Sequence, residues 1–207
     1  MHSADAAESD REGTYAPGLH AFAPLTDGEV CAQYGTVRDM LSQRSWAMKS
    51  LIVCVSKSHG NTRRVADRMA EVLEAEVVEP ESVDPEKISE YDLVGFGSGI
   101  YYMTVDKRLR DLIRRLPRVV GVRAFCFFTS GAREIPLLDY NKPVRNQLAA
   151  KGFEVIGSFS CRGFDTVGPF GFVGGINRGR PDDRDLDRAA EFAARLRKRV
   201  AGSQAAS

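Results

Sequence analysis

Residues 51–62 read LIVCVSKSHGNT and are the most informative segment of the chain. It opens with the apolar run Leu51–Val55, continues through a polar loop and leads into a helix-period pattern from Thr62. A short apolar run bounded by polar residues predicts a buried strand, here one that delivers a loop onto the start of a helix. The first amides of a helix have no intrahelical acceptor and lie at the positive end of its dipole. The junction therefore favours an anion such as a phosphate.

The loop of this junction differs from two common phosphate-binding loops. It matches neither Gly-x-x-x-x-Gly-Lys-Ser/Thr nor Gly-x-Gly-x-x-Gly, which disfavours a nucleoside triphosphate and a dinucleotide. Hydroxyls dominate it instead, and they suit a phosphate monoester held by Ser, Thr and backbone N–H groups. We therefore predict a mononucleotide, FMN. The predicted phosphate-loop residues are Ser56, Lys57, Ser58, His59, Gly60, Asn61 and Thr62.

Each type of residue in this loop has an expected role. The hydroxyl donors are Ser56, Ser58 and Thr62. Gly60 allows close approach of the backbone, and Asn61 either caps the helix or donates its own amide. His59 either stacks near the phosphate or is simply exposed, and we favour the exposed interpretation. The alternative for the whole loop is an ordinary strand-to-helix turn with an N-cap.

Beyond this junction the pattern alternates regularly between strands and helices. The predicted strands are 51–55, 77–79, 93–97, 122–129 and 154–160. The predicted helices are 62–74, 106–116, 142–150 and 183–200, the last one capped by Asp182. Strands separated by helices imply parallel pairing through right-handed crossovers. We therefore predict an α/β fold with a doubly wound five-stranded parallel sheet in the order 2-1-3-4-5, in three layers, α/β/α.

Three segments of the chain resemble the loops of one known family, the flavodoxins. Residues 56–62 resemble the flavodoxin FMN-phosphate loop, residues 97–102 (GSGIYY) the first flavin-flanking loop, and residues 129–132 (TSGA) the second. The resemblance covers about residues 49–200 and has the loops in the expected order. It implies a flavodoxin-like fold and non-covalently bound FMN, whose N5 carries the chemistry without a catalytic residue of the chain.

The resemblance also implies which residues flank the flavin. They are Ser98, Gly99, Ile100, Tyr101 and Tyr102 in the first loop and Thr129, Ser130, Gly131 and Ala132 in the second. Adjacent residues of an extended segment point to opposite sides, so we expect one tyrosine on the ring and the other packed inward. The alternative is that both tyrosines belong to the rim of the core.

The second loop departs from the usual flavodoxin pattern. Flavodoxins generally have an aromatic residue there and acidic residues around the flavin, whereas Arg133 and Glu134 follow Gly131-Ala132 in this chain. A positive charge near the N1/O2 edge of the ring would stabilise the anionic, fully reduced flavin. We therefore expect the two-electron reduction potential of the bound flavin to be less negative than that of an acidic flavodoxin.

The segment from Arg162 to Pro181 is long, with six glycines and the phenylalanines Phe164, Phe170 and Phe172. Loops of this length in compact domains are usually functional or disordered. It follows the fifth strand and so should emerge at the edge of the sheet that carries the flavin loops. It is either an apolar lid for a flat substrate such as a quinone or a surface loop pinned by its aromatic residues.

Composition limits the remaining possibilities. Residues 1–47 hold three Arg against seven Asp or Glu and lack sustained periodicity, so we predict a flexible extension before a domain at 48–201 and a flexible tail at 202–207. Met48 directly precedes the first strand, so translation starting there is a further hypothesis. The domain carries a net charge near +5, which favours an acidic protein partner, and its basic residues are too scattered for nucleic acid.

The sequence also argues against several kinds of site. It contains no apolar run that spans a membrane and no spaced cluster of metal ligands. Its four cysteines are scattered, which disfavours a disulfide framework and favours a reducing cytoplasm.

Two redox functions compete within the flavodoxin-like interpretation. One is electron transfer to a redox partner protein. The other is an FMN-dependent oxidoreductase acting on a quinone-like molecule, similar to quinone reductases or to menaquinone-dependent protoporphyrinogen oxidases of this fold. A third hypothesis is a cofactor-free interaction domain. The sequence leaves the oligomeric state open.

Overall fold

The computed structural model describes residues 48–57, 59–101, 104–131, 141–165 and 175–204. The predicted extension at 1–47 lies outside these residues. The strands are β1 (Ser50–Val55), β2 (Glu76–Val78), β3 (Leu93–Tyr101), β4 (Thr104–Val105), β5 (Arg123–Ser130) and β6 (Glu154–Arg162). The α-helices are α3 (Asn61–Leu73), α4 (Lys107–Arg115), α5 (Lys142–Ala150) and α6 (Asp183–Gln204). Two 3₁₀ helices, η1 (Pro80–Ser82) and η2 (Pro85–Glu90), lie between β2 and β3.

The main sheet is parallel and has the order β2-β1-β3-β5-β6. This is the predicted doubly wound order, with one short strand added outside it. That strand, β4, pairs antiparallel with the end of β3, where Ile100 lies opposite Val105 and Tyr101 opposite Thr104. The prediction that β3 ends at Gly97 was therefore wrong, because the chain continues extended into this hairpin.

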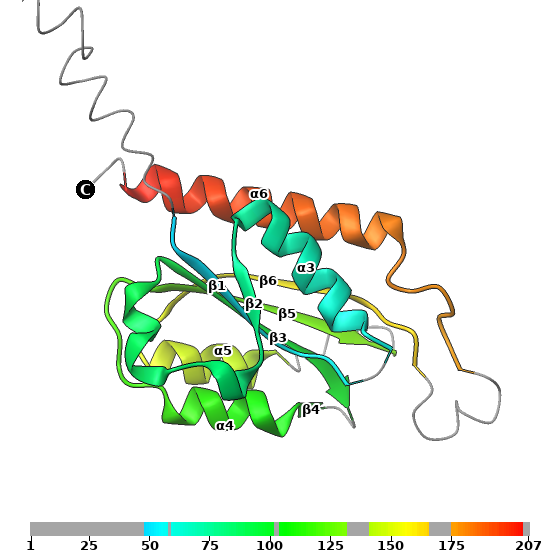
Figure 1. The fold of residues 1–207 in the computed structure, drawn as a ribbon, viewed down its shortest axis with the longest axis horizontal. Coiled ribbons are helices and arrows are strands. Elements are labelled where there is room, and N and C mark those ends of the chain that lie inside the picture. The colour runs from blue at the N-terminus through cyan, green and yellow to red at the C-terminus, as the bar shows by residue number, and fades with distance from the viewer. Residues whose placement is uncertain (1–47, 58, 102–103, 132–140, 166–174, 205–207) are drawn as a thin grey trace, which may run out of the picture. The chain divides into compact units, whose positions relative to one another are not determined.

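Helices cover both faces of the sheet (Figure 1), as the predicted three layers require. Side chains alternate between the faces along each buried strand: Val53 packs with α4 and α5 on one face, and Ile52 packs with α3 and α6 on the other. This two-sided burial explains why β1 and β5 are almost continuously apolar. The last helix runs to Gln204, so the first three residues of the predicted tail are helical.

The cysteines that the structure describes are part of this packing. Cys54 and Cys126 are buried on β1 and β5, and Cys161 is half-buried on β6. Burial raises the pKa of all three thiols to about 12, so they stay protonated at neutral pH. They act as small apolar side chains.

Two glycines of β3 give room to two phenylalanines of the neighbouring strand. Gly95 pairs with Phe125 and Gly97 with Phe127, and both phenylalanines are fully buried. A Cβ atom at either glycine would overlap the ring of its partner. The glycines thus let large rings from β5 lie over β3 and fill the layer beneath α3 and α6.

We predict that Gly97→Ala lowers the free energy of unfolding by about 1–3 kcal/mol, because the new methyl group overpacks the core against Phe127. Replacing that ring with the smaller leucine in the double variant Gly97→Ala/Phe127→Leu should cost less than the sum of the two single changes. Urea unfolding measures each value. Gly202→Ala is the control, since a Cβ there meets nothing within 4 Å. A Gly97→Ala variant as stable as the control would contradict this account of the packing.

Candidate functional site

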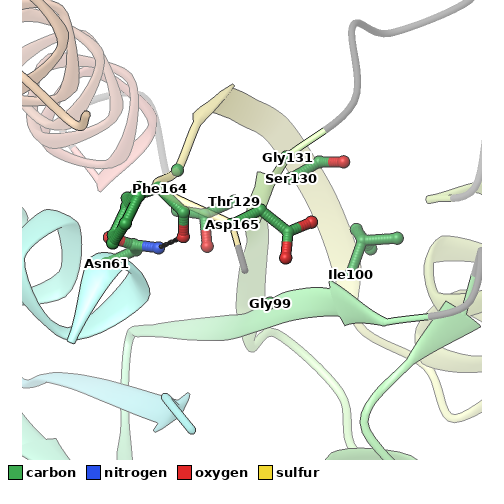
Figure 2. A pocket seen from close by; sticks show the side chains of 9 residues that line it. Asn61, Gly99, Ile100, Thr129, Ser130, Gly131, Phe164 and Asp165 are labelled. Carbon is green, nitrogen blue, oxygen red and sulfur yellow. Dashed lines mark hydrogen bonds between the residues drawn. The ribbon is translucent and has the colours of Figure 1, made fainter. Parts of the chain in front are cut away.

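The carboxyl ends of β1, β3, β5 and β6 meet at one edge of the sheet, where α3 also begins (Figure 1). A recess that is open to solvent lies at this edge. Figure 2 shows the residues that line it, which come from α3, from β3 and β5, and from the segment after β6. They are Asn61, Gly99, Ile100, Thr129, Ser130, Gly131, Gly163, Phe164 and Asp165.

The loop between β1 and α3 turns sharply before the helix. His59 and Gly60 both have left-handed backbone conformations, with φ of 53° and 67°. Gly60 occupies the N-cap position, and no side chain caps the helix there. The amides of the first turn are therefore available to an anion. Ser58 lies outside the described residues.

The hydroxyl of Ser56 is one of the few buried polar side-chain atoms with no hydrogen-bond partner in the described part of the chain. Leaving a buried hydroxyl unpaired costs about 1–3 kcal/mol, so a partner from outside the described residues would stabilise this position. Its position directly after β1 puts it at the start of the predicted phosphate loop.

The hydroxyls of Thr62 and Thr129 bond to each other, with 2.8 Å between their Oγ1 atoms, and both residues are buried. This contact joins the phosphate loop to the second predicted flavin loop. Each hydroxyl has one proton and can accept as well as donate. One proton is used between the two residues, so the other remains for a further acceptor.

Of the two roles that the sequence suggested for Asn61, donation by its amide is the one seen, with a backbone carbonyl as the acceptor. Its Nδ2 donates to the carbonyl oxygen of Phe164 at 2.7 Å, and it does not cap the helix. His59 is exposed, as predicted, and its ring centroid lies 4.4 Å from that of Phe164. Both residues thus hold the segment after β6 against the phosphate loop.

Lys57 contacts the start of α4. Its Nζ lies 2.6 Å from Oδ2 of Asp106, a carboxyl that is only 3% exposed and caps α4 by accepting from the amide of Arg108. Burial disfavours ionisation of Asp106, but the hydrogen bonds and charges of Lys57 and Arg108 outweigh it, so the pKa of Asp106 lies below its ordinary value. The ion pair links the phosphate loop to the element that follows the first flavin loop.

The first predicted flavin loop is the end of β3 and its hairpin. Ser98 is fully buried, and its hydroxyl donates to the carbonyl oxygen of Gly99 (2.6 Å) and accepts from the amide of Asp106 (3.1 Å). Gly99 and the half-buried Ile100 line the recess, in agreement with a loop that offers backbone groups. Tyr102 lies outside the described residues, so which tyrosine meets a ring stays a prediction.

The second predicted loop follows β5. Ser130 and Gly131 offer backbone to the recess, and both carbonyl oxygens are already used: that of Ser130 accepts from the amide of Gly163 at 3.0 Å, and that of Gly131 from Nδ2 of Asn177 at 2.6 Å. Ala132 and Arg133 lie outside the described residues.

The segment Gly163–Asp165 forms a wall of the recess that the predicted site residues did not include. The sequence carried a signal for it, because the glycine-rich loop was expected at this edge of the sheet and contains Phe164. Nothing in the pattern singled out Asp165. The remaining phenylalanines of that loop, Phe170 and Phe172, lie outside the described residues.

The described ranges contain no group of three or more His, Cys, Asp or Glu placed to hold a metal ion. None of their helices is both long enough and apolar enough to cross a bilayer.

Comparison with known proteins agrees with the fold. Residues 52–154 match a family described as a flavodoxin domain. An uncharacterised protein of Methanocaldococcus jannaschii, MJ0298, is 37% identical over 153 residues, which cover 73% of this chain and 99% of that one.

Solved flavodoxins share the architecture. Flavodoxin 2 from Bacillus cereus superposes with a TM-score of 0.57 at 18% identity, covering 73% of this chain and 99% of that one. A flavodoxin from the domain Archaea gives a TM-score of 0.53 at 18% identity, with 74% and 99% covered. The family match, the doubly wound sheet and the loops at its carboxyl edge together show that this chain belongs to the flavodoxin-like family.

Proposed function

We propose that this protein binds FMN at the carboxyl edge of its sheet and uses it to transfer electrons. The observation that carries the proposal is the start of α3, where the N-cap Gly60 supplies no side-chain acceptor and Asn61 lines the recess. Just before it in the chain, the buried hydroxyl of Ser56 has no hydrogen-bond partner among the described residues. These groups fit a phosphate monoester: the helix supplies amides and positive dipole, and Ser56 and the Thr62–Thr129 pair supply hydroxyl protons. Lys57, Ser58, Gly60 and Asn61 complete the proposed phosphate loop.

The residues proposed for the flavin ring are those of the other two loops. Ser98, Gly99 and Ile100 border it on one side with Tyr101 and Tyr102, and Thr129, Ser130, Gly131 and Ala132 border it on the other. When bound, FMN supplies the electron chemistry at N5, while the chain sets access to the ring and its electrostatic environment.

The chain's own described groups do not offer an alternative route for electrons. The three described thiols are held protonated by burial, and the thiolate is the reactive form of cysteine. The state of these three thiols supports a cofactor as the carrier of the electrons. A cofactor-free interaction domain is the weaker hypothesis, since it gives no reason for the unpaired hydroxyl of Ser56.

Two acceptors are compatible with such a site. A redox partner protein is the first, and the net charge near +5 of residues 48–207 favours an acidic one. A quinone-like molecule is the second, and it is favoured by the ring of Phe164, which lines the recess beside His59. We propose the cytoplasm as the compartment, because the three described cysteines, Cys54, Cys126 and Cys161, are free thiols.

We predict that the purified protein reconstituted with FMN is yellow and quenches flavin fluorescence. Ser56→Ala should weaken FMN binding about tenfold, because it removes a hydrogen bond to a charged group. The same change should leave the stability of the apoprotein unchanged or raise it, since an unpaired buried hydroxyl disappears. Fluorescence titration and urea unfolding measure the two effects.

Ser50→Ala is the matched control for this experiment. Ser50 is buried at the opposite end of the same strand, where its hydroxyl lies 3.4 Å from the carbonyl oxygen of Met48. FMN affinity should not change in that variant. Protein that stays colourless with excess FMN and does not quench its fluorescence would refute the proposed function.

We predict that Arg133→Ala makes the potential for the second electron more negative, because it removes a positive charge that favours the anionic reduced flavin. Potentiometric titration of the holoprotein with mediator dyes measures this potential. A second potential that is already strongly negative in the natural sequence and does not move in the variant would contradict the role of Arg133.

We predict that holoprotein reduced with dithionite is reoxidised rapidly by a soluble quinone, and that Phe164→Ala slows this reaction but not reoxidation by ferricyanide. Stopped-flow absorbance follows the return of oxidised flavin. Mixing the oxidised holoprotein with NADH or NADPH tests whether a nicotinamide serves as donor. If quinone reoxidises the natural sequence and the Phe164→Ala variant equally slowly, the quinone hypothesis is contradicted. Electron transfer to a protein partner then remains as the proposed function.

A further inference from the structure

Among the described residues that line the recess, one has an ionisable side chain, and it belongs to none of the three predicted loops. It is Asp165, three residues beyond the end of β6. Figure 2 shows its carboxylate pointing into the recess, between Thr129 and Ile100 and toward the end of β3 at Gly99. The group therefore lies between the phosphate loop at Asn61 and the first flavin loop at Ile100.

The neighbouring strand end leaves space for this carboxylate. A Cβ atom at Gly131 would overlap the side chain of Asp165 and would lie 2.6 Å from its Cγ. The side chain of Asp165 thus fills the volume that any side chain at position 131 would need. Glycine at 131 is what allows a polar group from the segment after β6 to enter the recess.

The backbone that carries Asp165 is held on both sides. Its amide donates to the carbonyl oxygen of Ile176 at 3.1 Å, and the amide of Ile176 donates back at 2.8 Å. The preceding residue, Phe164, accepts from Nδ2 of Asn61 and packs against His59. The carboxylate is therefore positioned before any ligand arrives, which limits the ordering that binding requires.

The chemistry of the group restricts what it can face. An ionised carboxylate only accepts hydrogen bonds, and it repels a phosphate. In the recess it therefore suits neutral donors, namely hydroxyl or N–H groups. FMN has both, in the hydroxyls of its ribityl chain and in the N–H of its ring, and these lie between its phosphate and the far end of the ring.

We propose that Asp165 faces the bound cofactor and accepts a hydrogen bond from a ribityl hydroxyl or the ring N–H of FMN, which makes the segment after β6 a third wall of the flavin site. This inference rests on the proposed function. The carboxylate of Asp165 would also affect reduction of the flavin. Oxidised FMN takes up two electrons and one proton to give the reduced anion, and the negative charge of Asp165 opposes that anion.

The first test is FMN affinity, measured by fluorescence quenching. Asp165→Ala removes the acceptor and should weaken binding about tenfold to a hundredfold, the range for a hydrogen bond to a charged group. Asp165→Asn keeps an acceptor oxygen, so its affinity should stay within about threefold of the natural sequence. Asp187→Asn on α6, whose side chain is 72% exposed, is the matched control and should have no effect.

The second test is the potential of the bound flavin, titrated with dithionite as the electron donor and solvent as the proton source. Asp165→Asn should favour the reduced anion about tenfold, which corresponds to a rise of about 59 mV for a one-electron couple. This is opposite in sign to the shift expected from Arg133→Ala. A change in either affinity or potential beyond that of Asp187→Asn supports the proposal.

Three results separate the possible failures. If the natural sequence does not bind FMN, the proposed function fails and this inference with it. If it binds FMN but both Asp165 variants match the Asp187→Asn control in affinity and potential, the proposed function stands and this inference is overturned. If Asp165→Ala does not fold, Asp165→Asn decides the question through its potential alone.

The variant Gly131→Ala gives an independent check that leaves Asp165 unchanged. Its methyl group displaces the carboxylate, so it should weaken FMN binding when Asp165 is present. In an Asp165→Gly background the overlap is gone, and the same change should have a much smaller effect. If Gly131→Ala weakens FMN binding equally in the two backgrounds, the proposed role of Gly131 in making room for Asp165 is overturned.

Discussion

The site depends on the strand order of the parallel sheet, in which the direction of strand addition reverses at β1. From β1 the chain crosses to β2 on one side, and then returns to β3, β5 and β6 on the other side. The helix that follows β1 covers one face of the sheet, and the helix that follows β3 covers the opposite face. The loops after these neighbouring strands therefore diverge and leave a crevice at their carboxyl ends, where open α/β sheets bind ligands. Every loop of the recess reaches this edge because the strands are parallel.

Side-chain contacts then hold these loops to one another. Thr62 bonds to Thr129, Asn61 bonds to the backbone at Phe164, and Lys57 pairs with Asp106. Each contact joins the phosphate loop to a different neighbour: the end of β5, the segment after β6 and the start of α4. Since the partners are distant in sequence, the fold has to form before the recess does. These contacts fix the described parts of the loops before a ligand arrives, which limits the ordering that binding requires.

The sequence predicted the parts of the molecule that local patterns determine. The strand at Leu51–Val55 and the helix at 142–150 were recognisable because the apolar pattern and the polar or turn-forming residues at their ends agreed. The order of the strands does not follow from periodicity, and it was predicted only because the loop after the first strand suited a monoester. The true end of β3 was missed, since the hairpin with Thr104–Val105 depends on pairing and not on the apolar pattern. Asp165 was missed because its significance comes from the missing side chain of Gly131, 34 positions earlier in the chain.

The start of α3 differs from that of two other helices in a way that bears on function. Asp106 caps α4, and Asp182 caps α6 by accepting from the amide of Asp185, so both helices satisfy amides of their first turn internally. Gly60 provides no such acceptor for α3, and the hydroxyl of Ser56 beside it has no partner either. A cap contributes about 1 kcal/mol and an unpaired buried hydroxyl costs about 1–3 kcal/mol. Local rules are broken in this way mainly at functional sites, where a ligand supplies the missing contacts. An anion at this position would satisfy both defects at once and would stabilise the folded chain by mass action, so cofactor binding and stability are expected to be coupled through the first turn of α3.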